Sequence, residues 1–250
     1  MTYTKHTGIA AAFTVGLTLA GATGALAGTV TGGSLLNGVG ADQLETWLGV
    51  GDQDFTNVWA GDAGVGTASS WHAAVDGAGA TFSIYDVRLG DGSSALIGGY
   101  TALSWAGSGY AYDATAFIFN LTTGEAQFTQ RDNSHSIYRY SSRYFATFGA
   151  GHDIFGGHDI LSTCNGNNFI TLCDGYTSSL SYDSSQGQIS VAGDTGYGSG
   201  DSGYDLRHIE VKSLETYTFA PAVTPVPLPA GGLLLITALG GLAAARRRKS

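Results

Sequence analysis

The 250-residue chain has little sulfur, since its one methionine is the initiator Met1 and its two cysteines are Cys164 and Cys173. The sequence therefore offers few residues for sulfur-based redox chemistry. The sequence holds no CxxC or HExxH motif, which are the usual zinc-binding patterns. In an exported protein two cysteines indicate a disulfide, and the alternative is a zinc site that would need two further ligands.

Proline is also scarce, and the four prolines gather near the C-terminal end, at Pro221, Pro225, Pro227 and Pro229. Proline fixes φ and has no amide hydrogen to donate. Residues 221–227 are therefore expected to be an extended spacer that lies outside the folded domain.

Cationic side chains are few between residues 28 and 220, where only Arg88, Arg131, Arg139, Arg143, Arg207 and Lys212 occur. All twenty acidic residues lie in the same region, so its formal charge is −14. Binding to phosphates requires the opposite charge, and no nucleic-acid partner is expected. Such acidity suits solubility in a salty, exported setting, and it repels anionic polymers unless divalent cations bridge them.

Residues 1–27 have the order of a secretory signal peptide. Lys5 precedes an apolar stretch at residues 8–20, and residues 25–27, Ala-Leu-Ala, fit the small-x-small cleavage pattern. The apolar stretch is short for a membrane span. The alternative is a buried N-terminal helix, but the pattern favours export with loss of residues 1–27.

Residues 228–250 have the order of a C-terminal membrane segment. Residues 228–245 carry no charge and just reach the length that crosses a hydrocarbon core of about 30 Å. A basic cluster follows and would stay cytoplasmic by the positive-inside rule; it consists of Arg246, Arg247, Arg248 and Lys249.

The motif before this segment consists of Val226, Pro227, Leu228, Pro229 and Ala230. With the apolar helix and the arginine cluster, it resembles the VPLPA form of the PEP-CTERM sorting tail. The resemblance implies a Gram-negative host and an exosortase-type processing enzyme as partner. It also implies transient anchoring in the inner membrane, then delivery to the cell surface or the exopolysaccharide matrix. A plain membrane anchor is the alternative.

The region between the two ends reads as a mainly β domain. Short alternating segments rich in β-branched and aromatic residues are separated by Gly-rich turns, which indicates an antiparallel sandwich or barrel. Strands are expected at residues 55–59, 80–89, 95–105, 114–121, 126–130, 136–140, 144–148, 169–173, 188–192 and 206–214.

Only two helices are expected. Asp42 and Glu45 fit a capping box for the first helix, and Gly49 fits its end. The second helix is expected to begin at Ser69 or Ser70, to bury Trp71, Ala74 and Val75, and to stop at Gly77.

Five stretches, taken in order, resemble the TLDc domain family: SSWHAAVDGAGATFSIYD (residues 69–86), IGGYTALSW (97–105), DATAFIFNL (113–121), YFATFGAGHDI (144–154) and DLRHIEVKSLE (205–215). The resemblance covers about residues 40–215. It departs from the family at Val75, where many members carry cysteine. The residues that match the structural motif of the family are Gly98, Gly99, Tyr100, Trp105, Phe148, Gly149, Gly151, His152 and Asp153.

The resemblance implies a two-sheet antiparallel β-sandwich with about two short flanking helices. Eukaryotic members are tied to oxidative-stress resistance, and some bind the vacuolar proton pump, which an exported bacterial protein would not meet. No catalytic constellation is established for the family, so no enzyme is expected. The hypothesis is an exported surface or extracellular-matrix protein that serves as a binding or structural module and meets exopolysaccharide or a surface protein.

Two alternatives stay open at this point. One is an envelope domain that protects against oxidative stress through an enzymatic activity. The other is a calcium-dependent carbohydrate binder, for which the thirteen tyrosines could supply exposed rings. Its calcium would bind the Gly-rich stretch from Asp194 to Asp205, whose spaced aspartates suit calcium but match no standard calcium loop. A solvated surface loop is the other interpretation of that stretch.

The tetrapeptide Gly-His-Asp-Ile occurs twice in residues 151–160. His152, Asp153, His158 and Asp159 together could form a divalent metal site. A catalytic role lacks a nucleophile and base at a recognisable spacing. Because only the first copy matches the family motif, the sequence favours a structural, hydrogen-bonded His152, and neither a cofactor nor a metal is predicted.

We predict that Cys164 and Cys173 are bonded to each other, because export places them in an oxidising compartment. In the chain-entropy model, closing this loop stabilises the fold by about 2.5–3 kcal/mol. Counting thiols in the denatured, unreduced protein checks this, and two reactive thiols would rule the bond out.

Overall fold

The computed structural model describes residues 28–129, 135–140, 143–162, 175–183, 189–193 and 207–223. These residues all belong to one compact unit, Leu26–Val223. Within them, no helix has the length and apolar character needed to cross a bilayer. Five predictions fall outside the described residues: the signal peptide, the strand at residues 169–173, the Cys164–Cys173 bond, the Asp194–Asp205 loop, and the tail with its sorting motif and basic cluster.

Two helices and thirteen strands make up the described structure, and the prediction of a mainly β chain with two helices is confirmed. The helices are α1 (Gly38–Leu48) and α2 (Ala68–Val75). The strands are β1 (Val30–Thr31), β2 (Gln53–Asp62), β3 (Thr81–Arg88), β4 (Ser94–Thr101), β5 (Ser108–Ala111), β6 (Phe117–Asn120), β7 (Glu125–Thr129), β8 (Ile137–Tyr140), β9 (Ile154–Phe155), β10 (Tyr176–Thr177), β11 (Tyr182–Asp183), β12 (Arg207–His208) and β13 (Glu210–Pro221).

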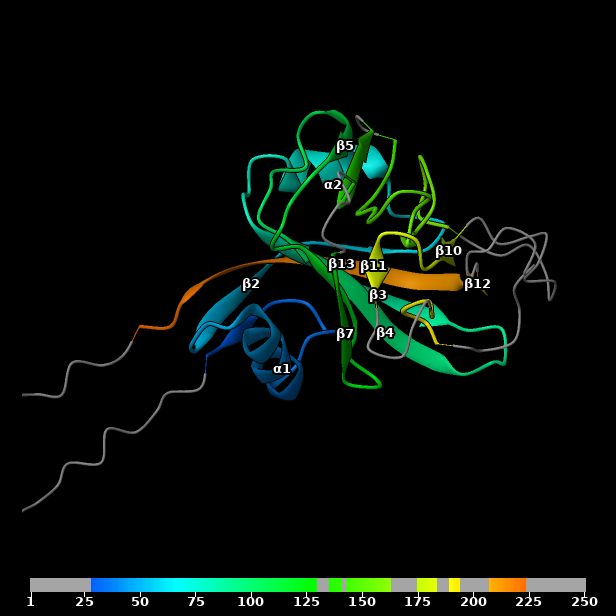
Figure 1. Cartoon of the computed structure of the whole chain (residues 1–250). Helices are drawn as coiled ribbons and strands as arrows, with labels where there is room; N and C mark the ends of the chain where they lie inside the picture. Colours follow the sequence, from blue (N-terminus) through cyan, green and yellow to red (C-terminus); the bar gives the residue numbers. More distant parts are fainter. Residues whose placement is uncertain are drawn as a thin grey trace, which may run out of the picture. The chain divides into compact units, whose positions relative to one another are not determined.

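One eight-stranded sheet forms the centre, in the order β1-β2-β13-β3-β4-β6-β7-β11. Every neighbouring pair in it is antiparallel except β1 and β2, which are parallel. The long strand β13 lies between β2 and β3 and pairs with both, so the last described strand fills the middle of the sheet (Figure 1). That strand continues to Pro221, the residue at which the spacer was expected to begin.

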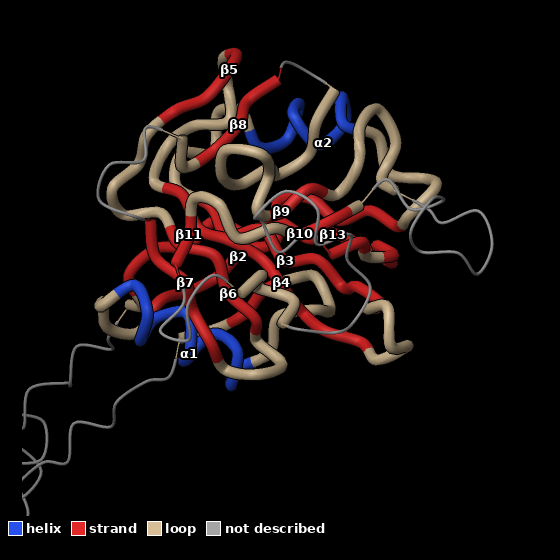
Figure 2. The backbone as a smooth tube through the Cα atoms, turned by 45° about the vertical axis from the view of Figure 1, so that its right-hand side comes forward, coloured by secondary structure: helices blue, strands red, loops and turns tan. Residues whose placement is uncertain are grey.

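Two smaller sheets accompany the central one, β12-β10-β9 and β5-β8. Phe148 forms single β-bridges to both Ile137 and Ile154, and so connects β8 to β9. In Figure 2 these small sheets and α2 lie on one side of the central sheet, and α1 lies on the other. The described strands thus fall mainly into one sheet, where the sequence predicted two sheets packed face to face.

The core has two parts, one on each face of the central sheet. On the α1 side, Ala41 and Leu44 pack on aromatic rings of β2, β3, β6 and β13, and Trp47 stacks on Phe119 at 5.8 Å between ring centroids. On the α2 side, Trp71 packs edge-on against Trp105 at 5.1 Å, and Trp105 packs edge-on against Phe148 at 5.5 Å. Full burial of each large apolar side chain stabilises the fold by about 1.5–3 kcal/mol.

The two indole N–H groups in this core both have acceptors. Trp71 donates to Thr216 Oγ1 and Trp105 donates to Thr81 Oγ1, each at 2.9 Å. Buried tryptophans need such partners because an unpaired buried donor is costly. The two threonines come from β13 and β3. These bonds therefore hold Trp71 of α2 and the neighbouring Trp105 against the central sheet.

The helix starts differ from the predicted ones. Asn37 caps α1, since its side chain accepts from Gly40 N, and Asp42 lies within the helix. Gly49 ends α1 with φ of 73°, as predicted. Thr67 caps α2, because its hydroxyl accepts from the N–H group of Ser70. Both capping predictions began the helix too late, because several residues near each start carry side chains that cap well.

Two predicted strands are wrong for a shared reason. Residues 144–148 and 188–192 contain β-type residues, but the described residues 144–148 and 189–192 form no strand. Side chains bond their backbone groups instead: Tyr85 donates to Ala146 O, and the amides of Asn120 and Gln127 donate to Val191 O and Ile189 O. Side-chain donors thus satisfy part of this backbone, and isolated backbone hydrogen bonds, such as Tyr138 N to Thr147 O, satisfy a further part.

Gly98 and Gly99 in β4 leave room for rings on opposite faces of the sheet. A Cβ added at Gly98 would meet Ser83 O and the ring of Phe119. A Cβ added at Gly99 would lie 2.5 Å from the ring of Phe148. Both glycines therefore allow close approach of a ring to the backbone.

We predict that Gly99→Ala lowers the free energy of unfolding by about 1–3 kcal/mol, because the added methyl group overpacks the contact with Phe148. Gly51→Ala is the matched control, since a Cβ there would meet no heavy atom within 4 Å. Its expected effect is within about 0.5 kcal/mol of zero. Urea unfolding of the three proteins measures this, and equal stability of the two variants would contradict it.

Candidate functional site: an aromatic and histidine face

The first Gly-His-Asp-Ile copy forms a tight turn at the end of the Phe148 segment. Gly149, Gly151 and His152 all have positive φ, at 82°, 69° and 67°. Phe148 and Ile154 exchange backbone hydrogen bonds at 3.1 and 3.2 Å and close the turn. Glycine adopts positive φ freely and other residues rarely do, which explains the glycines around His152.

Asp153 fixes this turn to a distant segment. Its side chain is fully buried, and its carboxylate accepts four hydrogen bonds from residues 178–182. The donors are Ser178 Oγ at 2.8 Å, Leu180 N at 2.6 Å, Ser181 N at 2.6 Å and Tyr182 N at 3.1 Å. Burial raises the pKa of Asp153, and these hydrogen bonds oppose that rise. Both oxygens are therefore occupied by the fold itself.

His152 is held by a tyrosine. Its Nδ1 atom lies 2.8 Å from the hydroxyl of Tyr176, and its ring stacks on Phe155 at 5.2 Å. Burial lowers the pKa of His152 to about 4 and raises the pKa of Tyr176 to about 12. At neutral pH the pair therefore consists of a neutral imidazole and a protonated phenol.

The second copy has different partners. His158 is exposed and forms a single β-bridge with Tyr144. Asp159, with φ of 59°, accepts hydrogen bonds from Nε and Nη2 of Arg143 at 3.0 and 2.8 Å. The carbonyl oxygen of Asp159 also accepts from Ala68 N at the start of α2. The repeated tetrapeptide is thus used in two unrelated ways.

His152 and His158 nevertheless lie against the same two rings. The ring centroid of Tyr144 is 5.7 Å from that of His152 and 6.0 Å from that of His158. Phe155 contacts both, at 5.2 and 6.1 Å. The backbone at Tyr144 is in turn held by α2, because Nε2 of the buried His72 lies 3.0 Å from Tyr144 O.

These rings belong to a larger surface, which we call the aromatic–histidine face. Its members are linked by ring contacts, and they are Tyr110, His135, Tyr138, Tyr144, His152, Phe155, His158, Tyr176 and His208. Four of the six histidines of the chain lie in it. The members come from β5, β8, β9, β10, β12 and the loops around them.

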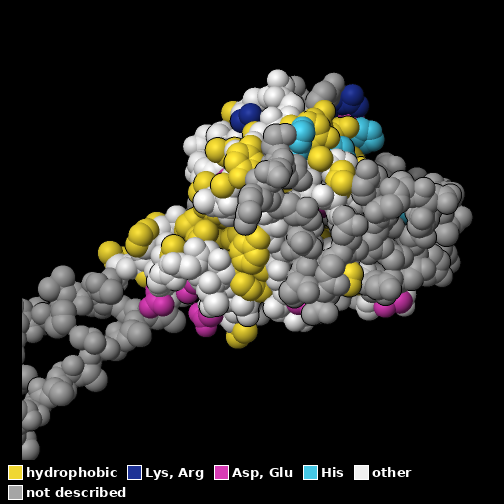
Figure 3. Space-filling model, viewed as in Figure 1, with side chains coloured by type: hydrophobic (Ala, Val, Ile, Leu, Met, Phe, Trp, Pro, Cys, Tyr) yellow, Lys and Arg dark blue, Asp and Glu magenta, His cyan; other side chains and the backbone are white. Residues whose placement is uncertain are grey.

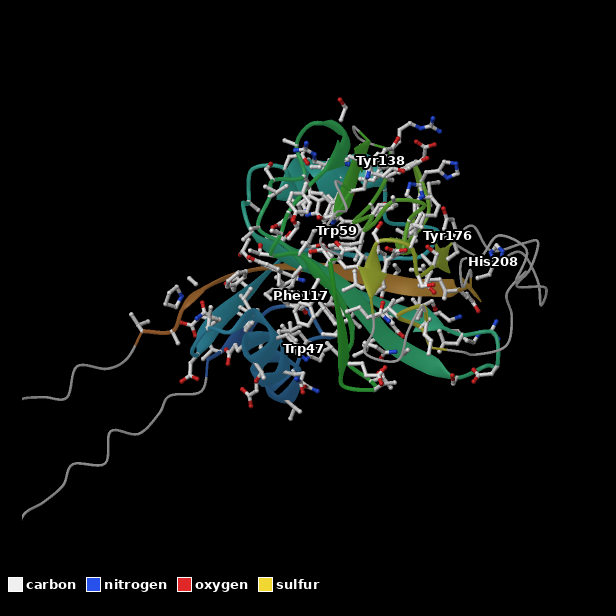
Figure 4. All side chains as sticks on the ribbon, in the orientation of Figure 1. Trp47, Trp59, Phe117, Tyr138, Tyr176 and His208 are labelled. Carbon is white, nitrogen blue, oxygen red and sulfur yellow. The ribbon has the colours of Figure 1, made fainter. Side chains whose placement is uncertain are left out.

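The contacts run across the face from one end to the other. Tyr138 lies 4.6 Å from Tyr110 and 5.4 Å from Tyr144, measured between ring centroids. Phe155 lies 5.2 Å from Tyr176, and Tyr176 lies 6.4 Å from His208. Figure 4 shows Tyr138, Tyr176 and His208 following one another from the top of the view to its right-hand side.

The face is partly open to solvent. Tyr110 is 41% exposed, while Tyr138, Tyr144, Tyr176 and His208 are half-buried. In Figure 3 histidines and hydrophobic side chains gather at the upper right of the molecule, and acidic side chains gather along its lower edge. Rings that are neither fully buried nor scattered singly are typical of a contact surface.

The described residues do not form a metal centre. Among them no group of three or more His, Cys, Asp and Glu side chains could hold a metal ion. Asp153 and Asp159, which the sequence offered as ligands beside the two histidines, instead accept hydrogen bonds from protein donors. The carboxylates of the repeat therefore hold segments of the fold together through hydrogen bonds.

The sequence singled out only part of this face. His152 and His158 were singled out from the repeat, whereas Tyr110, Tyr138 and Tyr176 gave no local signal. The excess of tyrosine and the clustering of four histidines after residue 134 were the available signs. No spacing rule joins them, because five separate segments supply the rings.

Comparison with known proteins adds no further identification. A scan of the chain against models of known protein families finds no match, and a search of curated proteins finds no similar sequence. The resemblances to the TLDc family and to the sorting tail therefore stay predictions.

We predict that the His152→Asn variant is less sensitive to acid than wild type. Asparagine tolerates the positive φ at this position and does not titrate. The histidine has a pKa of about 6.5 in the unfolded chain and about 4 in the fold. Between these pH values the unfolded chain binds more protons than the folded protein does. Wild type therefore loses stability as the pH falls.

The full shift corresponds to about 3 kcal/mol, and solvent screening of the partly exposed ring reduces the expected effect to about 1–2 kcal/mol. The stability difference between wild type and the variant should narrow by that amount from pH 7 to pH 4, as measured by urea unfolding. His158→Asn is the control for the substitution itself. At pH 7 it should lower the free energy of unfolding less than His152→Asn does. Parallel pH curves for wild type and His152→Asn would contradict this account.

Proposed function

We propose that this chain is an exported, exosortase-sorted TLDc-like protein of the cell surface or extracellular matrix, which acts as a non-enzymatic binding module. The observation that carries the proposal is the aromatic–histidine face, a set of rings in mutual contact on one side of the domain, all of them at least partly exposed except Phe155. The VPLPA-type tail supports export and sorting, and the five TLDc-like stretches support the domain family.

Three of the four acid–base candidates in the repeated tetrapeptide are occupied by contacts within the fold. A general base needs an accessible, correctly protonated group near the reacting atoms. His152 is tied to Tyr176, and both oxygens of Asp153 accept backbone or hydroxyl hydrogens. Asp159 is paired with Arg143, and hydrogen bonds from that side chain hold the pKa of Asp159 below its usual value.

The rings themselves suit a contact surface. Tyrosine offers a large rigid area and one polar atom, and it loses little conformational entropy on binding. Several of these rings already contact one another before any ligand binds. Their order reduces the entropic cost of binding a partner.

We predict that the mature protein is retained in the extracellular matrix of a Gram-negative host that carries an exosortase-type enzyme, and that the double variant Tyr138→Ala with Tyr110→Ala shifts it into the medium. The physical reason is the loss of two partly exposed contact rings. Immunoblots of membrane, matrix and medium fractions measure the distribution.

Two controls separate sorting from binding. In a host without the processing enzyme, the full-length chain should stay in the membrane, because the uncharged segment and basic cluster then remain attached. Phe128→Ala removes a ring that is 51% exposed and contacts Phe117 on the α1 side, and it should leave retention unchanged. Equal release with and without the enzyme would overturn the sorting proposal. Unchanged retention of the double variant would overturn the proposal that the aromatic–histidine face binds the matrix.

A further inference from the structure

The polar groups of the aromatic–histidine face are mostly hydroxyls. Tyr110, Tyr138, Tyr144 and Tyr176 each combine an apolar ring with one phenolic oxygen. The phenol of Tyr176 stays protonated far above neutral pH, because burial raises its pKa to about 12. Such groups donate and accept hydrogen bonds without carrying charge. A matching ligand has flat apolar patches edged by hydroxyls.

Few charged side chains lie on the segments that carry the face. Arg143 forms a two-bonded pair with Asp159, so this cation is neutralised by its partner. His152 is neutral at pH 7 because burial lowers its pKa to about 4. The region from 28 to 220 carries a formal charge of −14. An acidic polymer would therefore be repelled by the domain as a whole, although Arg139, which follows Tyr138 in β8 and donates to Ala106 O, adds one positive charge near these rings.

The rings contact one another in succession. Successive centroids from Tyr110 through Tyr138, Tyr144 and Phe155 to Tyr176 are 4.6–5.4 Å apart. The hydroxyl of Tyr176 is held by His152 at 2.8 Å, which fixes its direction. Phe155 is only 7% exposed, so the four tyrosines supply the accessible ring surface, and their succession fits an extended polymer that places its units on neighbouring side chains.

From these observations, and resting on the proposed function, we infer that the aromatic–histidine face binds an uncharged polysaccharide. The C–H faces of its sugar rings stack on the tyrosine rings, and its hydroxyl groups exchange hydrogen bonds with the tyrosine hydroxyls. This contact requires no metal ion.

Affinity gel electrophoresis at neutral pH tests the inference with full-length protein in a mild uncharged detergent. The gels contain dextran, laminarin or hydroxyethylcellulose as neutral probes, and alginate as the anionic probe. We expect at least one neutral polymer to retard the protein, with the same dissociation constant at about 0.05 M and about 0.5 M salt, because no charge pairing is involved. Adding a chelator should not change this dissociation constant.

Three variants locate the contact. Tyr138→Ala should weaken the binding by about fivefold or more, since one stacked ring is lost. Tyr110→Ser removes a ring that is 41% exposed and gives the same test where Tyr138→Ala fails to fold. Tyr176→Phe keeps its ring and loses its hydroxyl, and it should weaken the binding about threefold. Phe128→Ala should bind like wild type.

The possible results separate this inference from the proposed function. Retardation by none of the neutral polymers overturns the inference, even where matrix retention still depends on Tyr110 and Tyr138. Retardation by alginate alone, lost at high salt, also overturns it. Equal binding of wild type and Tyr138→Ala overturns the placement at this face. If the same variants lose both matrix retention and binding to the neutral polymer, the result supports the inference and the proposed function.

Discussion

The four hydrogen bonds to the Asp153 carboxylate hold the candidate site together. They join the turn of the first Gly-His-Asp-Ile copy to residues 178–182, which are far away in the sequence and lead into β11. Because the carboxylate is fully buried, removal of these donors would leave an unpaired charge in the interior. The position of His152 against Tyr176 depends on the same connection.

The central sheet gives this connection a rigid support. Strand β13 fills the gap between β2 and β3, and the N–H groups of Trp71 and Trp105 bind threonines of β13 and β3. Gly99 lets the ring of Phe148 lie directly on β4. The turn that begins at Phe148 therefore starts from a fixed point, and the rings that follow are ordered by close packing.

The two copies of the tetrapeptide show why a repeated motif does not ensure a repeated role. The first Asp is buried among backbone donors, and the second lies on the surface with Arg143. The neighbours of each copy decide this: glycines at 149 and 151 permit the first turn, while the second adjoins the start of α2. Exposed pairs such as Arg143 and Asp159 contribute little to stability, so the first copy carries most of the structural role.

The sequence by itself determined the mainly β character, the two helices, the end of α1 at Gly49 and the acidity of the domain. These follow from local periodicity, turn residues and composition, which act over a few residues. Runs of β-branched and aromatic residues identified β3 and β6, but the same signal failed at residues 144–148, where the structure has only single β-bridges at Tyr144 and Phe148. The tertiary structure alone decided the single eight-stranded sheet and the aromatic–histidine face, because both depend on contacts between segments far apart in the chain, and no local spacing records which distant ring a tyrosine will meet.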